Sequence, residues 1–225
     1  MKSVVMCVAI VMAFATASLA QEAPRTLAVV GEGSAEAAPD MAVISLGVTH
    51  TDASAKAAMD RVSADASALL STLSGMGVEP RDVQTDQLSI SPLWNNDEGA
   101  RDITGFVARN SLSVRVRNIG ALGAVLDAAL SAGSNDFNGL RFQLQDSTDA
   151  KAEARAAAVA DAIARATQLA EAAGVTLGPI QTITEQGDSG MRPEMFAAAR
   201  ASDMPVAPGE LSLSARVSVT FDLIP

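Results

Sequence analysis

The amino-acid sequence predicts an α+β fold made of two pseudo-repeated strand-helix-strand-strand units that are joined by a short helix, with the helices packed on antiparallel sheet. The first observation is a motif that occurs twice. Residues 52–78 and 149–175 both begin Asp-Ala-x-Ala and end Gly-Val, 97 positions apart. The second observation is that each copy leads to a strand with the pattern Leu-Ser-x-Arg-Val, at 112–116 and 213–217. Helices interspersed among antiparallel strands give a two-layer α+β arrangement, so we expect the two units at about 40–117 and 139–223.

The two copies of the motif predict long amphipathic helices at about 53–75 and 150–173. Asp52 and Asp149 stand where an acceptor side chain caps a helix, and Gly75 or Gly77 and then Gly174 stand where helices end. Each helix carries an apolar stripe with the 4-3-4-3-4-3 spacing of a single helix face. The stripes are Ala55, Met59, Val62, Ala66, Leu69, Leu73 and Met76, and then Ala152, Ala156, Val159, Ile163, Ala166, Ala170 and Ala173.

Alternating apolar and polar residues predict strands with one buried and one wet face. The expected strands are 26–30, 42–49, 83–91, 112–116, 140–144, 180–184 and 211–223. The strand at 140–144 is expected to open the second unit, as 42–49 opens the first. Turn-forming residues predict loops at 92–102 and 186–209, and Ile119–Ser131 is expected to be the joining helix.

Residues 1–20 have the pattern of a secretory signal peptide. Lys2 gives a positive start, residues 4–14 are apolar, and Ser18-Leu19-Ala20 is a small-x-small cleavage site. The apolar run is too short for a permanent anchor, so no transmembrane span is expected in the mature chain, 21–225. The only cysteine would leave with the signal, which excludes disulfides. In a bacterial cell the expected location is the periplasm, and peripheral association with the outer membrane stays open.

The mature chain is strongly acidic. It would carry 15 basic and 26 acidic residues, which is a formal charge of −11. Such a surface repels the phosphate backbone of nucleic acids, so no nucleic-acid partner is expected.

No constellation of residues predicts catalysis, a cofactor or a metal site. His50 is the only histidine, and it has neither a cysteine partner for zinc nor a Gly-x-Ser-x-Gly nucleophile elbow. Gly31-x-Gly33 lacks the third glycine of a dinucleotide fingerprint and is expected to form a turn at the end of a strand. A class that the sequence leaves open is an enzyme with an unrecognised carboxylate and arginine site, such as Asp97 or Asp102 near Arg109.

Charged residues also group in two other places. Asp97, Glu98 and Asp102 lack EF-hand spacing and are expected to form a solvated acidic loop. Arg115 and Arg117 share the polar face of one strand, and Arg216 holds the place equivalent to Arg115 in the second copy. These arginines fit either an anion or partner site or cross-strand pairs with carboxylates, and pairing is favoured.

The segment 186–209 is the best candidate for a partner contact. Methionine side chains adapt to irregular partner surfaces, and this segment concentrates them among turn residues. Together with one aromatic residue of the first loop, the candidate contacts are Met191, Met195, Phe196, Met204 and Trp94.

The order and spacing of short motifs along the mature chain resemble the SIMPL-domain family of exported immunogenic proteins. The matching residues are Gly31-x-Gly33, Pro39-Asp40, Gly77-Val78, Asp82-Val83-Gln84-Thr85, Ile90-Ser91-Pro92, Gly105-Phe106-x-Ala108-x-Asn110, Gly139-Leu140-x-Phe142 and Pro205-x-x-Pro208-Gly209. Many relatives have a tyrosine shortly after the Ser-Pro, whereas this chain has Trp94.

The resemblance implies an exported protein without an established enzymatic activity. It also implies a link to envelope or oxidative stress and assembly into oligomers. From this we expect a homo-oligomer with a binding or scaffolding role in the cell envelope, with contacts through strand edges, the alanine-rich helix or residues 186–209. A protein client and a soluble ring with a channel-like shape are the other readings of the same resemblance.

Overall fold

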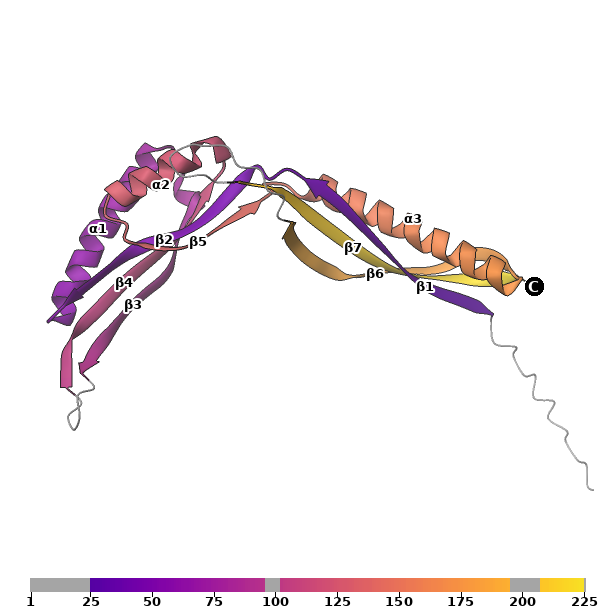
Figure 1. Cartoon of the computed structure of the whole chain (residues 1–225), viewed down its shortest axis with the longest axis horizontal. Coiled ribbons are helices and arrows are strands. Elements are labelled where there is room, and N and C mark those ends of the chain that lie inside the picture. Colours follow the sequence, from indigo (N-terminus) through magenta and orange to yellow (C-terminus); the bar gives the residue numbers. More distant parts are fainter. Residues whose placement is uncertain (1–24, 96–101, 195–206, 225) are drawn as a thin grey trace, which may run out of the picture.

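The computed structural model describes residues 25–95, 102–194 and 207–224, which form two antiparallel sheets with helices on one face of each. Figure 1 shows that the two units meet at a bend. The helices lie on the outer side of the bend and the sheets lie on its inner side. The α+β class that the sequence predicts is therefore confirmed.

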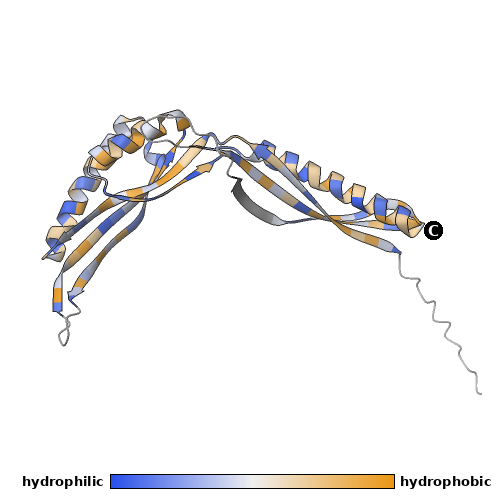
Figure 2. Cartoon of the chain, viewed as in Figure 1, coloured by the Kyte–Doolittle hydropathy of each residue, from blue (hydrophilic) through white to orange (hydrophobic). Residues whose placement is uncertain are grey.

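The first unit is a four-stranded sheet in the order β3-β4-β2-β5, covered by two helices. Its elements are β2 (Met41–Asp52), α1 (Ala55–Gly75), η1 (Pro80–Asp82), β3 (Val83–Asn95), β4 (Asp102–Val116), η2 (Ile119–Ala121), α2 (Leu122–Ser131) and β5 (Asp136–Gln143). Hydrophobic and hydrophilic residues alternate along its strands in Figure 2, which is the pattern of a sheet covered on one face.

The second unit is a three-stranded sheet in the order β1-β7-β6, covered by one helix. Its elements are β1 (Thr26–Ala37), α3 (Thr148–Ala173), β6 (Thr176–Glu194) and β7 (Glu210–Ile224). The first and last strands pair along their whole length, from Thr26 opposite Asp222 to Ala37 opposite Leu211. The segment that folds as the first unit therefore lies between two neighbouring elements of the second.

Two expectations about which element belongs to which unit are wrong. The strand expected to open the second unit is β5, and it pairs with β2 of the first sheet. Its place in the second sheet is taken by β1. The helix expected to join the units is α2, which instead packs into the first core through Leu122, Val125 and Leu126. Partner choice in a sheet depends on contacts far apart in sequence, so local spacing could not settle it. The repeat within the sequence stays a prediction.

Large aliphatic side chains fill the first core. Ile44 and Leu46 of β2 pack with Leu69 and Leu73 of α1 and with residues of β4 and α2. The predicted stripe of α1 is right in its middle, because Val62, Ala66, Leu69 and Leu73 are all buried. It is wrong at its ends, because Met76 is exposed and Ala58 is buried instead.

Small residues form the second core. The buried face of α3 consists of five alanines at intervals of four, Ala154, Ala158, Ala162, Ala166 and Ala170. Only the last two belong to the predicted stripe, and the side chain of Ile163, which the stripe includes, is 40% exposed. Three of these alanines, Ala158, Ala162 and Ala166, pack against Val217, Val219 and Phe221 of β7. A face without bulky side chains lets the helix axis come close to the sheet.

The glycines of β1 explain how close that approach is. A Cβ atom on Gly31 would overlap the carbonyl oxygen of Ala158, and one on Gly33 would overlap that of Ala154. Gly31-x-Gly33 therefore lies inside β1, and the expected turn at this motif is wrong. The motif is needed because only a residue without a side chain leaves room for the backbone of α3.

Helix ends depart from the sequence expectation at their N-termini. Ser54 caps α1, since its Oγ accepts a hydrogen bond from the amide of Ala57 at 3.4 Å. Asp52 instead accepts from the amide of Ser54 at 3.2 Å. Asp149 lies in the first turn of α3 and makes no cap, although a carboxylate is favourable there. Gly174 ends α3 with φ of +71°, as predicted.

Both predicted loops are shorter than expected, because the hairpin strands continue into them. β3 runs to Asn95 and β6 runs to Glu194, each paired with the following strand. Cross-strand pairing here outweighs the local preference of turn-forming residues.

A polar network ties together the two chain segments that cross between the units. The amide of Gln145 donates to Asp40 Oδ1 at 2.7 Å, and Arg117 Nη1 donates to Gln145 Oε1 at 3.3 Å. Arg117 also donates two hydrogen bonds to the carboxylate of Asp82, at 2.6 and 2.7 Å. The Asp82 side chain is only 3% exposed. The hydrogen bond from Arg117 is the main cause that holds the pKa of Asp82 below its ordinary value.

Candidate functional site

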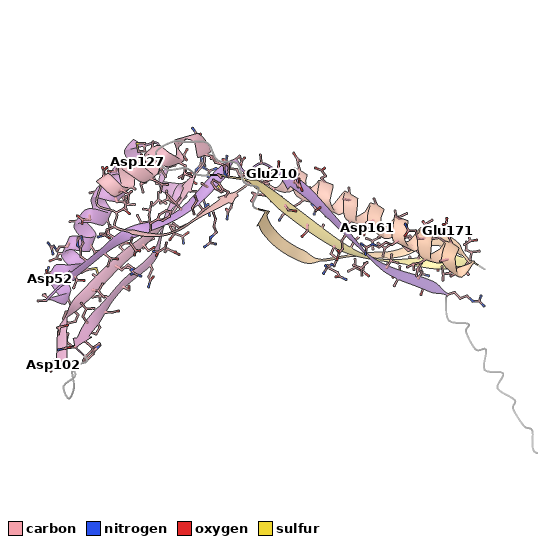
Figure 3. The ribbon with its side chains drawn as sticks, viewed as in Figure 1. Asp52, Asp102, Asp127, Asp161, Glu171 and Glu210 are labelled. Carbon is pink, nitrogen blue, oxygen red and sulfur yellow. The ribbon has the colours of Figure 1, made fainter. Side chains whose placement is uncertain are left out.

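The outer edge of β1 is closed by side chains of α3. Asp161 Oδ2 accepts a hydrogen bond from the amide of Glu32 at 2.9 Å, and Arg165 Nη1 donates to the carbonyl of Val30 at 3.2 Å. The hydrogen bond from Glu32 is the main cause that lowers the pKa of Asp161. Figure 3 shows Asp161 on α3 in the second unit. Because the amide of Glu32 and the carbonyl of Val30 already have hydrogen-bond partners, this part of β1 cannot accept another strand.

β3 and β6 form the opposite edges of their sheets, and each pairs with one neighbour only. Each strand contains bulges, which natural sheets use to limit pairing at an edge. Between these irregularities β3 keeps seven residues in regular register, Gln87–Leu93, and β6 keeps five, Thr182–Gln186. We call these two segments the free edges. Their outward backbone groups form a template for a further strand.

The free edges also carry apolar side chains that the helices do not cover. Leu88 and Ile90 are 60% and 40% exposed, and Ile183 is 52% exposed. Ile90 pairs with Ala108 and Ile183 pairs with Val219, both of which are buried beneath a helix. The exposed residues therefore lie on the helix-covered face but beyond the reach of α1 and α3. A strand added at either edge would bring its own side chains beside them.

The predicted partner contacts fall mostly outside what the structure describes. Met195, Phe196 and Met204 lie outside the described residues, and the side chain of Met191 on β6 is also outside the described set. Trp94 lies on β3 opposite Ile103, and the two side chains are 52% and 49% exposed. The first unit thus has an exposed apolar pair close to its free edge.

The acid and arginine combination expected for an enzyme is not formed by Asp102. Asp102 begins β4 at the far tip of the first unit (Figure 3), seven residues from Arg109 on the same strand. Seven extended residues span roughly 20 Å. Arg109 instead forms an ion pair with Asp136 at 3.0 Å. Asp97 and Glu98 lie outside the described residues.

His50 lies near the end of β2, as the sequence suggests, and its Nε2 is 2.5 Å from Asp65 Oδ2 of α1. The contact links the strand to the helix that covers it. Within 25–95, 102–194 and 207–224, no three His, Cys, Asp or Glu side chains gather as they would around a metal ion. The helices in the same ranges are also too short or too polar to cross a bilayer.

Sequence reasoning identified β3 and β6 as strands but did not identify their free edges. Leu88 and Ile90 alternate with polar residues as in any half-buried strand. Nothing local distinguishes a strand at the edge of a sheet from one in the middle, because the neighbours come from distant parts of the chain.

Comparison with known proteins assigns the chain to a family. Residues 27–221 match the model of the SIMPL family, "Protein of unknown function (DUF541)". The chain is 34% identical to the 26 kDa periplasmic immunogenic protein of Brucella melitensis, over 94% of this chain and 92% of that protein. It is 28% identical to the uncharacterized protein YggE of Edwardsiella ictaluri, over 86% of this chain and 84% of that protein. The two-layer α+β protein described above belongs to the SIMPL family. Neither relative carries the name of an enzyme.

Proposed function

We propose that this protein is an exported, non-enzymatic scaffold of the cell envelope that assembles with copies of itself through the free edges of β3 and β6. One observation carries the proposal: both sheets end in a segment of regular register whose neighbouring apolar side chains lie uncovered. Strand addition satisfies the outward backbone groups and removes these side chains from water. The alanine-rich face of α3 does not contribute to the assembly, because β1 and β7 already occupy it.

The periplasm is the compartment that we propose for this role. The name of the Brucella melitensis relative supports it, and so does the signal-peptide pattern of residues 1–20. Tolerance of oxidative stress is part of the proposal, since methionine side chains can be oxidised reversibly and the mature chain, residues 21–225, has six of them. Peripheral contact with the outer membrane is compatible with the same role.

The molar mass of the mature chain, residues 21–225, tests the proposal by size-exclusion chromatography with light scattering. We expect a mass several times that of the monomer. Leu88→Lys and Ile183→Lys place a charge beside the two free edges and should each reduce that mass. Leu130→Lys is the matched control, because Leu130 is 50% exposed on α2, away from both edges.

A monomeric parent protein would overturn self-assembly. Edge variants that assemble as the parent does would overturn the role of the edges. A monomer that captures an extended peptide at the same edges would instead identify a protein client as the partner.

A further inference from the structure

Two arginines on the inner face of the first sheet form no ion pair with a carboxylate among the residues that the structure describes. Among the described side chains, ion pairs engage Arg61, Arg81, Arg109, Arg117, Arg155, Arg165 and Arg216. The sequence suggested cross-strand pairing for three arginines, and it is found where Arg216 contacts Glu32 across β7 and β1. Arg115 and Arg141 enter no ion pair within the described residues. The chain has 26 acidic and 16 basic residues, so carboxylates are abundant. The absence of an ion pair at these two arginines is therefore unexpected.

The sheet register places these two side chains side by side. Arg115 of β4 and Arg141 of β5 both pair directly with Val43 of β2, one from each side. Directly paired residues point to the same face of a sheet. The neighbours of Val43 along β2, Ala42 and Ile44, are buried under the helices, so the arginine pair faces the open side. Figure 1 shows that this side is the inside of the bend.

The surface next to the pair is open and polar. Two residues further along β2, Ser45 pairs with Ser113 on one side and with Gly139 on the other. A Cβ atom at Gly139 would have no neighbour within 4 Å, so no side chain fills that position. Two serines and an empty position thus adjoin the two arginines on the same face of the sheet. A ligand held by the arginines could also accept hydrogen bonds from the serines.

The geometry and chemistry favour a phosphate group as ligand. The Cα atoms of two residues that flank one strand are roughly 10 Å apart, so two long side chains can converge on one anion. A carboxylate has two oxygens and is satisfied by a single guanidinium fork. A phosphate offers three or more oxygens and can accept from two forks at once.

We propose that Arg115 and Arg141, with Ser45 and Ser113, form a binding site for a phosphate-bearing ligand on the inner face of the first sheet. The site is distinct from the free edges, so this proposal does not depend on whether the chain assembles. Nearby charge supports it. Arg115 is close enough to Asp82 to contribute to the lowered pKa of that carboxyl group. Asp82 itself is neutralised by Arg117. The local field is therefore positive although the whole chain is acidic.

Isothermal titration calorimetry of the mature chain with sodium pyrophosphate tests the site. We expect saturable binding that weakens as salt is added, because added ions screen the attraction. Arg115→Gln and Arg141→Gln should each weaken binding about tenfold, and the double variant should lose it. Arg115→Lys keeps the charge but loses the fork and should fall between the parent and Arg115→Gln.

Arg216→Gln is the matched control. It removes the same charge from an exposed arginine in the other sheet and should leave pyrophosphate binding unchanged. Circular dichroism confirms that each variant folds. Co-sedimentation with phosphatidylglycerol vesicles, compared with phosphatidylcholine vesicles, separates a lipid headgroup from a soluble phosphate as the source of the group. Binding of either probe that the double variant loses supports the site. Absence of binding to both probes, or binding that the double variant retains, would overturn it.

Discussion

In the first unit the helix α1 packs on its sheet through Val62, Leu69 and Leu73, whereas in the second unit all the fully buried residues of α3 are alanines. Both sheets have a strand order in which the strand after the helix lies at the edge. The first core gains stability from the area of large side chains, at about 25 cal/mol per Å². The second gains it from close approach, which two glycines of β1 make possible. Two units with similar layouts should therefore fail under opposite substitutions, one when side chains are removed and the other when they are added.

Leu73→Ala should give the largest effect, because it leaves a cavity in the first core. Leu73 is fully buried, and truncating such a leucine lowers the free energy of unfolding by about 2–5 kcal/mol. The position 97 residues later is Ala170, where Ala170→Gly should cost only about 1 kcal/mol. Urea unfolding measures both losses: Trp94 fluorescence reports on the first unit, since Trp94 is the only tryptophan, and circular dichroism reports on both units. Equal losses for the two substitutions would contradict the proposed difference between the cores.

Gly33→Ala should give the next largest effect, because it adds a methyl group where no room exists. The new Cβ would meet the backbone of α3 at Ala154 and Ala158, so the helix must move. We expect a loss of about 1–3 kcal/mol, which is typical of overpacking. Thermal unfolding of the parent and the variant, followed by circular dichroism of the whole protein, measures this loss.

Gly75→Ala is the control for that substitution. A Cβ at Gly75 has nothing within 4 Å, and the residue lies in the last turn of α1. It should be neutral or stabilise the protein by about 0.5–1 kcal/mol. If both substitutions destabilise the protein equally, the close approach of α3 to β1 is not the cause of the loss in Gly33→Ala.

Acid should weaken the first unit through Asp82, and this is the smallest of the three effects. The pKa of Asp82 is lower in the folded state than its ordinary value near 3.9. Its contribution is therefore complete above about pH 4 and is lost as the pH falls through the folded pKa. Asp82→Asn should cost about 1–2 kcal/mol near neutral pH, because Arg117 is 42% exposed and solvent screens the pair.

The difference between Asp82→Asn and the parent should shrink when urea unfolding is repeated below pH 4. In the second unit the pKa of Asp161 is also lowered, but its side chain is 32% exposed. Asp161→Asn should therefore have a smaller effect. A gap between Asp82→Asn and the parent that is independent of pH would show that the ionised carboxylate is not what stabilises the junction.

The sequence by itself determined which segments form helices and strands. The period of apolar residues gave α1, α3 and β7 close to their observed bounds, because a regular element repeats its buried face locally. The middle of the α1 stripe, from Val62 to Leu73, was correct for the same reason. The α3 stripe was right at Ala166 and Ala170 but missed Ala154, Ala158 and Ala162, because a helix made largely of alanine has no apolar pattern that marks one side.

Only the tertiary structure decided which strands are neighbours. It placed β1 beside β7, although the two strands lie near opposite ends of the sequence. It also assigned β5 to the first sheet and left β3 and β6 at sheet edges. It also brought Arg115 and Arg141 to either side of Val43, where neither sequence position suggested the other. The physical reason is that strand pairing is selected by the fit of whole surfaces, and residues that meet across a sheet carry no shared signal in the local sequence.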